Sequence, residues 1–536
     1  MHGSAEVAEV AERPGEAGEA EARSPHVVIV GGGISGLAAA FFLRDAPVTV
    51  TVFEGSPRLG GKLAVSEVAG IAVDEGAEAL LARRPEGTGL ISELGLSGQL
   101  AVPATTAAAI WTRGALRPLP RGQLMGVPSD LDELARSGVL SAAGEARARR
   151  DMELPATRRD GDVPVASFVA ARLGQEVVDR LVDPLLGGVY AGRSEQLSLE
   201  ATLPSLAAAS RHYISLTEAA RSLLPPRGQP GREEPHPSSM TSIFTTLTGG
   251  LATLVPAVAA ASGARLRTGY AVRGLARTPA GWRLTAGPAS APERVDADAV
   301  IVAVPARPAG RLLAGVPGAG PASAALGEIE YASMAIVTLA YPRAAFPQSG
   351  GPQSGERQSG GPQSGERQSG ERQSGGPQSG GPPARGSGYL VPAVDGRAVK
   401  AVTFSTVKWP HLFAAGDAVD IVRCSIGRIG ETGLLQRDDD ELAALAAADL
   451  AAATGVRGKP LDARVTRWGG ALPQYTVGHL DRVARIRAAV AAQPGLAVCG
   501  AAYDGLGIPA CIATGRAAAD RVLGYLRGVL GGRPPR

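Results

Sequence analysis

A glycine-rich turn between two apolar runs constrains the fold of this chain more than any other feature. The run His26–Val30 leads into Gly31-Gly32-Gly33-Ile34-Ser35-Gly36, and a second run over 48–53 ends at Glu54. Between the two runs, apolar residues recur at helical spacing: Ile34, Leu37, Ala38, Phe41 and Phe42. This order predicts a βαβ unit that binds a dinucleotide: a strand, a glycine turn, a helix, a second strand and a terminal acid.

The residues of this unit have separate expected roles. Gly31 permits the tight turn, Gly33 lets the backbone approach a pyrophosphate, and Gly36 lets the helix pack closely against the strand. The N-terminus of the helix directs N–H groups toward the phosphates. Glu54 accepts hydrogen bonds from the hydroxyl groups of an adenosine ribose and would repel a 2′-phosphate.

The segment after Glu54 narrows the choice of cofactor. Arg58, Gly60, Gly61 and Lys62 follow the acid directly. A nicotinamide-binding unit has no need for a second glycine pair and a cation at this place, whereas an extended cofactor with a ribityl chain does. The order of acid, arginine and glycine pair resembles the FAD-binding segment of the flavin amine oxidase superfamily. The alternative is a solvated turn with an ordinary surface arginine.

Length, charge and cysteine content limit the remaining possibilities. At 536 residues the chain exceeds one ordinary hydrophobic core, which predicts two or more domains. The 54 basic and 51 acidic residues leave a net charge of +3, too small a field to favour nucleic acid. Three cysteines without ligand spacing suggest neither a disulfide framework nor a zinc site, and they fit a reducing, cytoplasmic setting. No signal peptide or transmembrane segment is evident in the sequence.

The pattern of the whole chain predicts an α/β protein with a discontinuous Rossmann-type FAD-binding domain and an inserted α+β substrate domain, made of a largely helical lobe and a mixed sheet. Strand-like runs recur at 265–273, 282–285, 297–304 and 496–499, and a helix over about 505–526 follows the last of them. The expected parts are a disordered tail over 1–25, the FAD-binding domain over 26–104, 241–305 and 466–530, the helical lobe over 105–240, and a sheet-containing domain over 306–465. Within the last part, seven QSGGP or QSGER pentads over 348–382 predict a disordered loop, because such repeats bury too little apolar surface.

Two further stretches resemble the FAD-binding segments of flavin amine oxidases. Gly249-Gly250-Leu251 with Leu254 resembles a turn and helix of that superfamily, and Val272 falls where its backbone contacts the adenine. In the stretch 499–512, glycines let the backbone approach the cofactor, and a new helix is expected after Asp504. The N–H groups of that helix would face the flavin pyrimidine edge, where negative charge grows on reduction. Asp504 is either part of the cofactor site or a simple N-cap.

Inner motifs resemble one family of this superfamily, the protoporphyrinogen oxidases. They are 183–192 (DPLLGGVYAG), 331–335 (YASMA), 408–411 (KWPH), 472–479 (LPQYTVGH) and 503–509 (YDGLGIP). The resemblance runs from about residue 26 to 528 without the pentads, and it is greatest to the Gram-positive branch, which is understood to oxidise coproporphyrinogen III to coproporphyrin III in haem biosynthesis. Two features depart from the family pattern: the pentads, and Asp74-Glu75-Gly76-Ala77-Glu78, where relatives commonly have Gly-Pro.

The resemblance implies an FAD-dependent enzyme that removes six electrons from a porphyrinogen by three hydride transfers to flavin N5, with O2 as acceptor and H2O2 as product. No catalytic side chain is needed, because the redox chemistry belongs to the flavin. The alternatives are protoporphyrinogen IX as substrate, another flavin oxidase that acts on an amine or a carotenoid, and a non-enzymatic binding protein on the same scaffold. The expected partners are the porphyrinogen, O2 and, transiently, the next enzyme of haem synthesis; no metal is expected.

The cofactor site implied by these motifs comprises Gly31, Gly33, Ile34, Ser35, Gly36, Glu54, Arg58, Gly60, Gly61, Lys62, Gly76, Ala77, Val272, Gly500, Asp504, Gly507 and Ile508. For the substrate, we expect an apolar slot with cations at its rim. The candidate cations, each otherwise a solvated surface charge, are Arg83, Arg84 and Lys408. The candidate slot residues, each otherwise part of an ordinary core, are Tyr190, Tyr331, Trp409 and Tyr475. We expect His411 and His479 to be structural rather than proton shuttles, and Cys511 to be a buried thiol rather than a flavin tether.

Overall fold

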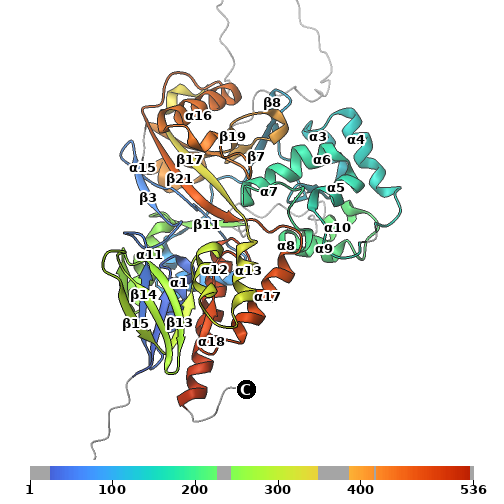
Figure 1. The fold of residues 1–536 in the computed structure, drawn as a ribbon. Coiled ribbons are helices and arrows are strands. Elements are labelled where there is room, and N and C mark those ends of the chain that lie inside the picture. The colour runs from blue at the N-terminus through green and yellow to red at the C-terminus, as the bar shows by residue number, and fades with distance from the viewer. Residues whose placement is uncertain (1–23, 158, 226–242, 348–384, 416–417, 531–536) are drawn as a thin grey trace, which may run out of the picture.

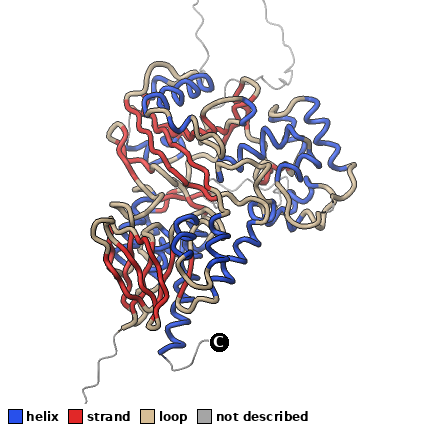
Figure 2. The backbone as a smooth tube through the Cα atoms, in the orientation of Figure 1, coloured by secondary structure: helices blue, strands red, loops and turns tan. Residues whose placement is uncertain are grey.

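The structure is a computed structural model that describes residues 24–157, 159–225, 243–347, 385–415 and 418–530. Nearly all of the expected tail over 1–25, and the whole pentad loop over 348–382, lie outside the described residues. Figure 1 shows a lower body that contains the first strands and the last helix, an upper body built on a long sheet, and a helical lobe beside the upper body. Figure 2 shows strands in both bodies and mostly helices in the lobe.

Five parallel strands form the central sheet of the lower body, in the order β12-β2-β1-β16-β22. They are β1 (His26–Val30), β2 (Thr49–Glu54), β12 (Arg265–Thr268), β16 (Ala299–Val302) and β22 (Leu496–Val498). Val27, Val28 and Ile29 are fully buried, because a parallel sheet that is covered on both faces needs apolar side chains at successive positions. The predicted α/β fold with a Rossmann-type unit assembled from distant segments is confirmed.

Helices and a small antiparallel sheet cover the two faces of this central sheet. On one face, α1 (Ile34–Phe42) packs against α18 (Ile508–Leu530) and buries Val27 and Ile29. On the other face, Val28 and Val30 pack into a core shared with three strands and three helices. These are β13 (Val272–Thr278), β14 (Gly281–Ala286), β15 (Glu293–Ala297), α12 (Ala306–Ala314), α13 (Gly320–Gly327) and α17 (His479–Ala491). Helices α12 and α13 therefore belong to the lower body, although the sequence pattern placed them with the second domain.

A seven-stranded sheet forms the upper body, in the order β21-β17-β20-β19-β18-β7-β8. Its strands are β7 (Ala108–Thr112), β8 (Ala115–Pro118), β17 (Tyr331–Pro342), β18 (Gly388–Leu390), β19 (Val399–Phe404), β20 (Val419–Ile426) and β21 (Asp462–Pro473). The predicted Ala-rich helix is α16 (Asp439–Thr454), which packs Leu442, Ala446 and Leu450 into the core of this sheet. The segment expected to be helical from residue 105 thus begins with two strands of the sheet, because β7 pairs with β18, which lies far along the chain.

The helical lobe has its own apolar core, which includes Val169, Leu181 and Leu186. Its helices are α3 (Leu131–Ser137), α4 (Ala142–Arg149), α5 (Val165–Leu173), α6 (Gln175–Val177), α7 (Asp183–Tyr190), α8 (Leu199–Thr202), α9 (Pro204–Ala209) and α10 (Leu216–Ser222). None of the helices in the described part of the chain is long and apolar enough to cross a membrane.

Further short elements pack against or between the two bodies. They are β3 (Val65–Val68), β4 (Ile71–Asp74), β5 (Leu80–Leu81), α2 (Pro85–Glu93), β6 (Leu100–Ala101), β11 (Phe244–Leu247), α11 (Leu254–Ala261), α14 (Ser405–Lys408) and α15 (Pro410–Ala415). β3 and β4 pair as a hairpin, and β11 lies between β5 and β6. The segment between β4 and β5 lies where the two bodies meet, and it carries part of the candidate site.

Candidate functional site

The glycine turn between β1 and α1 has a geometry that suits close approach of a ligand. Gly31 has φ +112°, and a Cβ there would lie 2.5 Å from the carbonyl oxygen of Ala303. A Cβ on Gly36 would lie 2.0 Å from the carbonyl oxygen of Gly31, so the helix can pack this closely only with glycine. A Cβ on Gly33 would meet no protein atom within 4 Å. Gly33 thus leaves open space at the N-terminus of α1, where N–H groups favour phosphate.

Glu54 and Arg58 order the loops beside this turn. The Glu54 carboxylate accepts hydrogen bonds from Gly32 N at 2.8 Å and Ser56 N at 2.7 Å, which holds it at the end of β2. Arg58 donates to the carbonyl oxygens of Leu59, Gly61 and Leu63 and so braces the second glycine turn from outside. Arg58 therefore shapes the loop that carries the second glycine turn, and it supports the candidate site through that loop.

A large cavity of about 1,080 Å³ lies between the glycine turn, the C-terminal motif and the upper sheet. Fourteen of the residues expected to hold the cofactor line it: Gly31, Gly33, Ile34, Ser35, Glu54, Gly60, Gly61, Lys62, Gly76, Ala77, Val272, Gly500, Gly507 and Ile508. Gly36, Arg58 and Asp504 are not among the lining residues within the described ranges. The predicted residues from five separate stretches are thus brought together around one space.

Apolar side chains that the sequence reasoning missed form another part of the cavity wall. They are Val189 from α7, Met334 and Ile336 from β17, and Trp468 and Leu472 from β21. Trp468 is fixed by a hydrogen bond from its Nε1 to the carbonyl oxygen of Glu75 at 3.0 Å. Val189 and Leu472 belong to the GVYAG and LPQY motifs themselves, so both were within reach of sequence reasoning.

Two titratable side chains in the wall are held uncharged by their surroundings. Cys511 lines the cavity, and burial raises the pKa of its thiol, so the group stays protonated. Tyr331 lines it too, and burial raises the pKa of this phenol to about 12. The Tyr331 hydroxyl also accepts a hydrogen bond from Ala306 N at 2.9 Å, which ties β17 to the start of α12. Lys62 differs in kind, since burial in the wall lowers the pKa of its ammonium group.

The C-terminal motif is clamped by a tyrosine rather than by Asp504. The Tyr475 hydroxyl donates to the carbonyl oxygen of Ala501 at 2.7 Å and accepts from Gly505 N at 2.8 Å. Helix α18 begins at Ile508, later than the expected start at about residue 505, so of the two roles considered for Asp504 that of N-cap is wrong. The intervening residues through Gly507 form an irregular turn, and the Asp504 carboxylate forms an ion pair with Arg487.

His479 at the start of α17 and Tyr190 of the lobe support this clamp. The His479 ring stacks on Tyr475 with centroids 3.9 Å apart, and its Nε2 lies 3.2 Å from the carbonyl oxygen of Tyr503. Burial lowers the pKa of His479 to about 4, so the ring is neutral near pH 7. The Tyr190 ring lies 5.6 Å from that of Tyr475, and both belong to the core of the lobe. Neither tyrosine lines the large cavity as the structure describes it.

The segment Asp74–Glu78 separates the large cavity from a second, small pocket. Gly76 and Ala77 face the large cavity, whereas Asp74 and Glu78 line the small pocket of about 140 Å³. Trp409 lines the small pocket and not the large cavity within the described residues, so it does not form part of the expected substrate slot at the large cavity. His411 lines the same small pocket.

Glu78 forms a buried ion-pair cluster that explains the position of Lys408. Its carboxylate oxygens lie 2.7 Å from Lys408 Nζ and 2.5 Å from Arg423 Nη1. Burial alone would raise the pKa of Glu78, but attraction to the two cations lowers it to about 2. Arg423 also donates to the carbonyl oxygen of Gly76 at 2.6 Å and so fixes the cavity wall. Lys408 is already paired and is a poor candidate for a cation that receives a substrate carboxylate.

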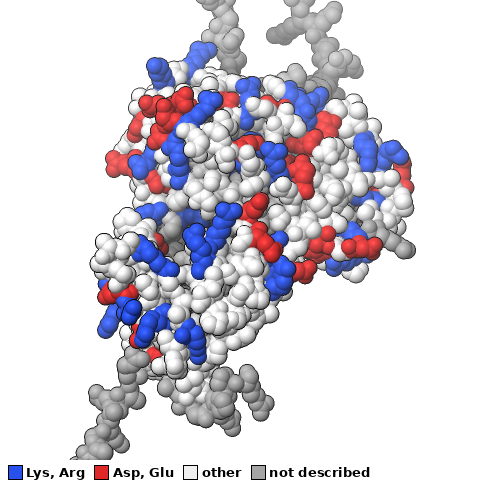
Figure 3. Space-filling model, in the orientation of Figure 1, with Lys and Arg blue, Asp and Glu red and all other residues white. Residues whose placement is uncertain are grey.

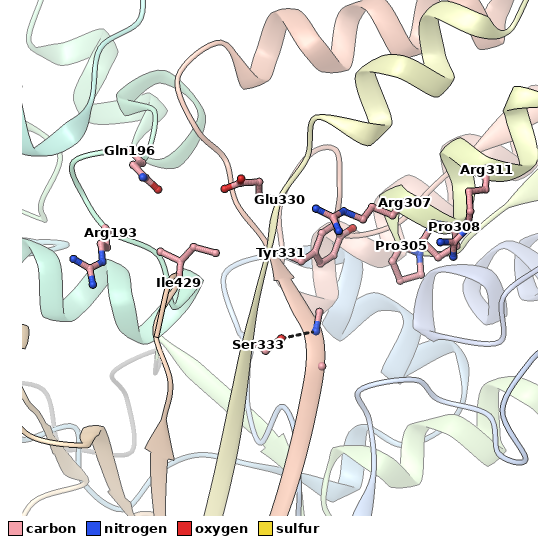
Figure 4. A pocket seen from close by; sticks show the side chains of 13 residues that line it. Arg193, Gln196, Pro305, Arg307, Pro308, Arg311, Glu330, Tyr331, Ser333 and Ile429 are labelled. Atoms are coloured by element: carbon pink, nitrogen blue, oxygen red, sulfur yellow. Dashed lines mark hydrogen bonds between the residues drawn. The ribbon is translucent and has the colours of Figure 1, made fainter. Parts of the chain in front are cut away.

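Arg83 and Arg84 lie at the exposed start of α2, apart from both cavities as described. Arg84 forms an exposed ion pair with Glu86 at 3.3 Å. Three other arginines, which the sequence reasoning missed, surround a third pocket of about 870 Å³. This arginine pocket is lined by Arg193 from the lobe, Arg307 and Arg311 from α12, and Glu330 and Tyr331 between them (Figure 4). Figure 3 shows basic side chains beside a hollow between the lower and upper bodies on this face.

The sequence held one signal for Arg307 and Arg311, because both follow the strand β16. β16 is parallel to β1, so its carboxyl end meets the glycine turn, and Arg307 and Arg311 follow it one helical turn apart. Arg193 directly follows the GVYAG motif. Within the described residues, no group of three or more His, Cys, Asp or Glu side chains is arranged to hold a metal ion.

Comparisons with known proteins show what this chain is similar to. The sequence matches the family model described as flavin containing amine oxidoreductase over residues 34–523. A coproporphyrinogen III oxidase of Mycobacterium tuberculosis (strain ATCC 25618 / H37Rv) is 38% identical over 498 residues, which cover 91% of this chain and 95% of the relative. A coproporphyrinogen III oxidase of Bacillus subtilis (strain 168) is 30% identical over 509 residues, which cover 94% of this chain and 98% of the relative. A crystal structure from Exiguobacterium sp. 255-15, of a protein provisionally named protoporphyrinogen oxidase, aligns with a TM-score of 0.75 at 28% identity, over 93% of this chain and 98% of that one.

Proposed function

The chain belongs to the flavin containing amine oxidoreductase family, and we propose that this FAD-dependent enzyme oxidises coproporphyrinogen III to coproporphyrin III. The balanced reaction consumes three O2 and releases three H2O2 for each porphyrinogen, because six electrons and six hydrogens leave the substrate. The observation that carries the proposal is the large cavity, in which a dinucleotide site and an apolar wall share one space. Two relatives of nearly the same length, each named coproporphyrinogen III oxidase, support the choice of substrate.

The lining of the large cavity fits FAD. The space that a Cβ on Gly33 would occupy is free of protein atoms, which allows a pyrophosphate to approach the N-terminus of α1. The Glu54 carboxylate stands at the end of β2, where it can accept hydrogen bonds from ribose hydroxyl groups. Gly507 and Ile508 line the cavity where α18 begins, and the N-terminus of this helix favours negative charge on a flavin ring. When bound, FAD supplies the hydride acceptor and passes electrons to O2.

The side chains in the cavity position the reactants and exclude water. Met334, Ile336 and Leu472 provide an apolar surface of the kind that a tetrapyrrole macrocycle requires. Tyr331 and Cys511 stay protonated near pH 7 because burial raises the pKa of each, so neither accepts a proton from the substrate. In this proposal the protein contributes placement and a fixed electrostatic field. That no side chain acts as nucleophile stays a prediction. A cytoplasmic location and a transient contact with the next enzyme of haem synthesis stay predictions from the resemblance.

Aerobic turnover of the FAD-loaded protein tests the proposal. Coproporphyrinogen III should be converted to fluorescent coproporphyrin faster than it autoxidises, with three H2O2 formed per porphyrin. Protein stripped of FAD is the matched control and should fall to the autoxidation rate. A rate that is equal with and without the FAD-loaded enzyme contradicts the proposed reaction.

A further inference from the structure

The arginine pocket adjoins the large cavity but lies on the other side of a two-stranded ribbon. Ser333 of β17 and Gly470 of β21 line the arginine pocket, and Gly470 N donates to Ser333 Oγ at 3.0 Å. Their neighbours Met334 and Ala471 line the large cavity instead. The two spaces meet at four shared residues: Pro305, Pro308, Arg311 and Tyr331. A ligand in the arginine pocket would therefore border the cofactor site.

Positive charge in this pocket comes from two separate parts of the fold. Arg307 and Arg311 lie on α12, both are exposed, and neither forms an ion pair with a described residue. Arg193 projects from the lobe on the opposite side (Figure 4). It forms an ion pair with Glu431 at a long 3.5 Å. Glu330 is the only acidic side chain among the lining residues, so the described lining has three cations and one anion.

We propose that the arginine pocket binds the propionate carboxylates of the porphyrinogen, with Arg307 and Arg311 on one side of the macrocycle and Arg193 on the other. The guanidinium group suits this ligand because it can pair with a carboxylate through two parallel hydrogen bonds. Tyr331, at the junction of the two spaces, marks the edge at which the macrocycle enters the large cavity. This inference rests on the proposed function, since it concerns the same substrate.

Cations on both sides of the pocket favour the substrate with more carboxylates. Coproporphyrinogen carries four carboxylates, one on each pyrrole, whereas protoporphyrinogen carries two, with vinyl groups in place of the others. A macrocycle with carboxylates around its whole edge can engage α12 and the lobe together. A macrocycle with carboxylates along one edge can engage only one of these sides at a time. The arginine pocket is thus a specificity-determining site of this enzyme.

Binding of porphyrins to the FAD-loaded, oxidised enzyme is the direct test. The wild-type enzyme should bind coproporphyrin III more tightly than its tetramethyl ester by about tenfold or more, because charge-assisted hydrogen bonds are lost with the carboxylates. The double variant Arg307→Gln/Arg311→Gln should lose most of this preference, and its KM for coproporphyrinogen should rise by a similar factor while kcat changes little. Arg193→Gln should narrow the ratio of kcat/KM between coproporphyrinogen and protoporphyrinogen.

A matched control removes the same charge elsewhere. Arg265 of β12 and Arg294 of β15 are exposed and line none of the three pockets. Arg265→Gln/Arg294→Gln should leave the porphyrin affinity and KM unchanged. FAD absorbance and the thermal midpoint of each variant verify that the fold is intact.

Two results would overturn the inference while leaving the proposed function standing. One is equal binding of the free acid and the tetramethyl ester by wild-type enzyme that turns over coproporphyrinogen. The other is a KM for Arg307→Gln/Arg311→Gln that equals that of the charge-matched control. Failure of the proposed function has a different outcome, in which the wild-type enzyme neither oxidises the porphyrinogen nor binds the porphyrin.

Discussion

Replacing Tyr475 with Phe removes one oxygen atom that joins the two ends of a turn in the candidate cofactor site. The Tyr475 hydroxyl donates to the carbonyl oxygen of Ala501 and accepts from Gly505 N, and Ala501 lines the large cavity. The phenylalanine ring would keep the contacts with His479 and Tyr190. Burial raises the pKa of Tyr475 well above its usual range, so the phenol stays protonated and the effect should not depend on pH below about 10.

The size of the effect follows from the two lost hydrogen bonds. Each is worth roughly 1 kcal/mol net, and a buried group left without a partner costs roughly 1–3 kcal/mol. The two lost bonds alone come to about 2 kcal/mol against the closed form of the turn, and each group left buried without a partner adds to this cost. If FAD requires the closed turn, its dissociation constant should rise by a factor of about 30 or more, since 1.4 kcal/mol corresponds to tenfold.

Fluorescence titration of apoprotein with FAD is the appropriate measurement, because unfolding of a chain of this size is rarely a single transition. Tyr389→Phe is the matched control: Tyr389 is also buried, but within the described residues its hydroxyl has no hydrogen-bond partner. Tyr389→Phe should leave the FAD dissociation constant unchanged. An unchanged constant for Tyr475→Phe as well would refute the argument that this hydroxyl closes the turn.

Three further predictions test other parts of the site. Gly33→Ala should leave the thermal midpoint of the apoprotein nearly unchanged, because the added Cβ meets no protein atom within 4 Å. Titration with FAD should show binding that is at least tenfold weaker. An FAD affinity equal to that of the wild type would show that this turn does not belong to the cofactor site. Glu78→Gln leaves Lys408 and Arg423 facing no carboxylate and should destabilise the protein by roughly 3 kcal/mol near pH 7. The pKa of Glu78 is lowered to about 2. The thermal midpoint of the wild type should therefore exceed that of Glu78→Gln above pH 4.5, and this difference should shrink as the pH falls toward 2. A difference in thermal midpoint that does not change with pH contradicts this expectation. Burial lowers the pKa of His479 to about 4, so the folded protein resists protonation of this ring. The free energy of unfolding of the wild type should therefore fall by about 3 kcal/mol as the pH drops from 6.5 to 4. Thermal melts at pH 7 and pH 5 should show this loss for the wild type and not for His479→Gln.

The fold could be predicted from the sequence where local pattern and burial agree. The strands β1, β2 and β16 are continuous apolar runs because the sheet is covered on both faces, and such runs are legible without knowledge of their partners. The strands β7 and β8 are short, and the partner of β7 is β18, far along the chain. No local sequence pattern distinguishes β7 and β8 from the helical segment that follows. The expected helical lobe, which starts at residue 105, therefore includes these two strands of the sheet.

The candidate site likewise contains residues that local sequence patterns indicate and residues whose roles depend on distant partners. Glycines of the candidate cofactor site have local causes, such as the positive φ of Gly31, so they could be proposed from the sequence, and the structure places Gly31 at the large cavity. The roles of Lys408 and Tyr475 depend on Glu78 and on the turn from Ala501 to Gly505, which only the folded chain brings near. A cation or an aromatic ring in a motif can be recognised from sequence, but whether it faces a ligand or a protein partner is decided by residues that are distant along the chain.

Initial rates on two porphyrinogens test the central claim most directly. FAD-loaded enzyme is mixed in air with coproporphyrinogen III or protoporphyrinogen IX at matched concentrations, and porphyrin fluorescence and H2O2 are followed above autoxidation. The account predicts a higher kcat/KM for coproporphyrinogen III, with three H2O2 per coproporphyrin. Oxidation of neither substrate above the autoxidation rate would contradict the porphyrinogen oxidase assignment, and a clear preference for protoporphyrinogen IX would contradict the choice of substrate.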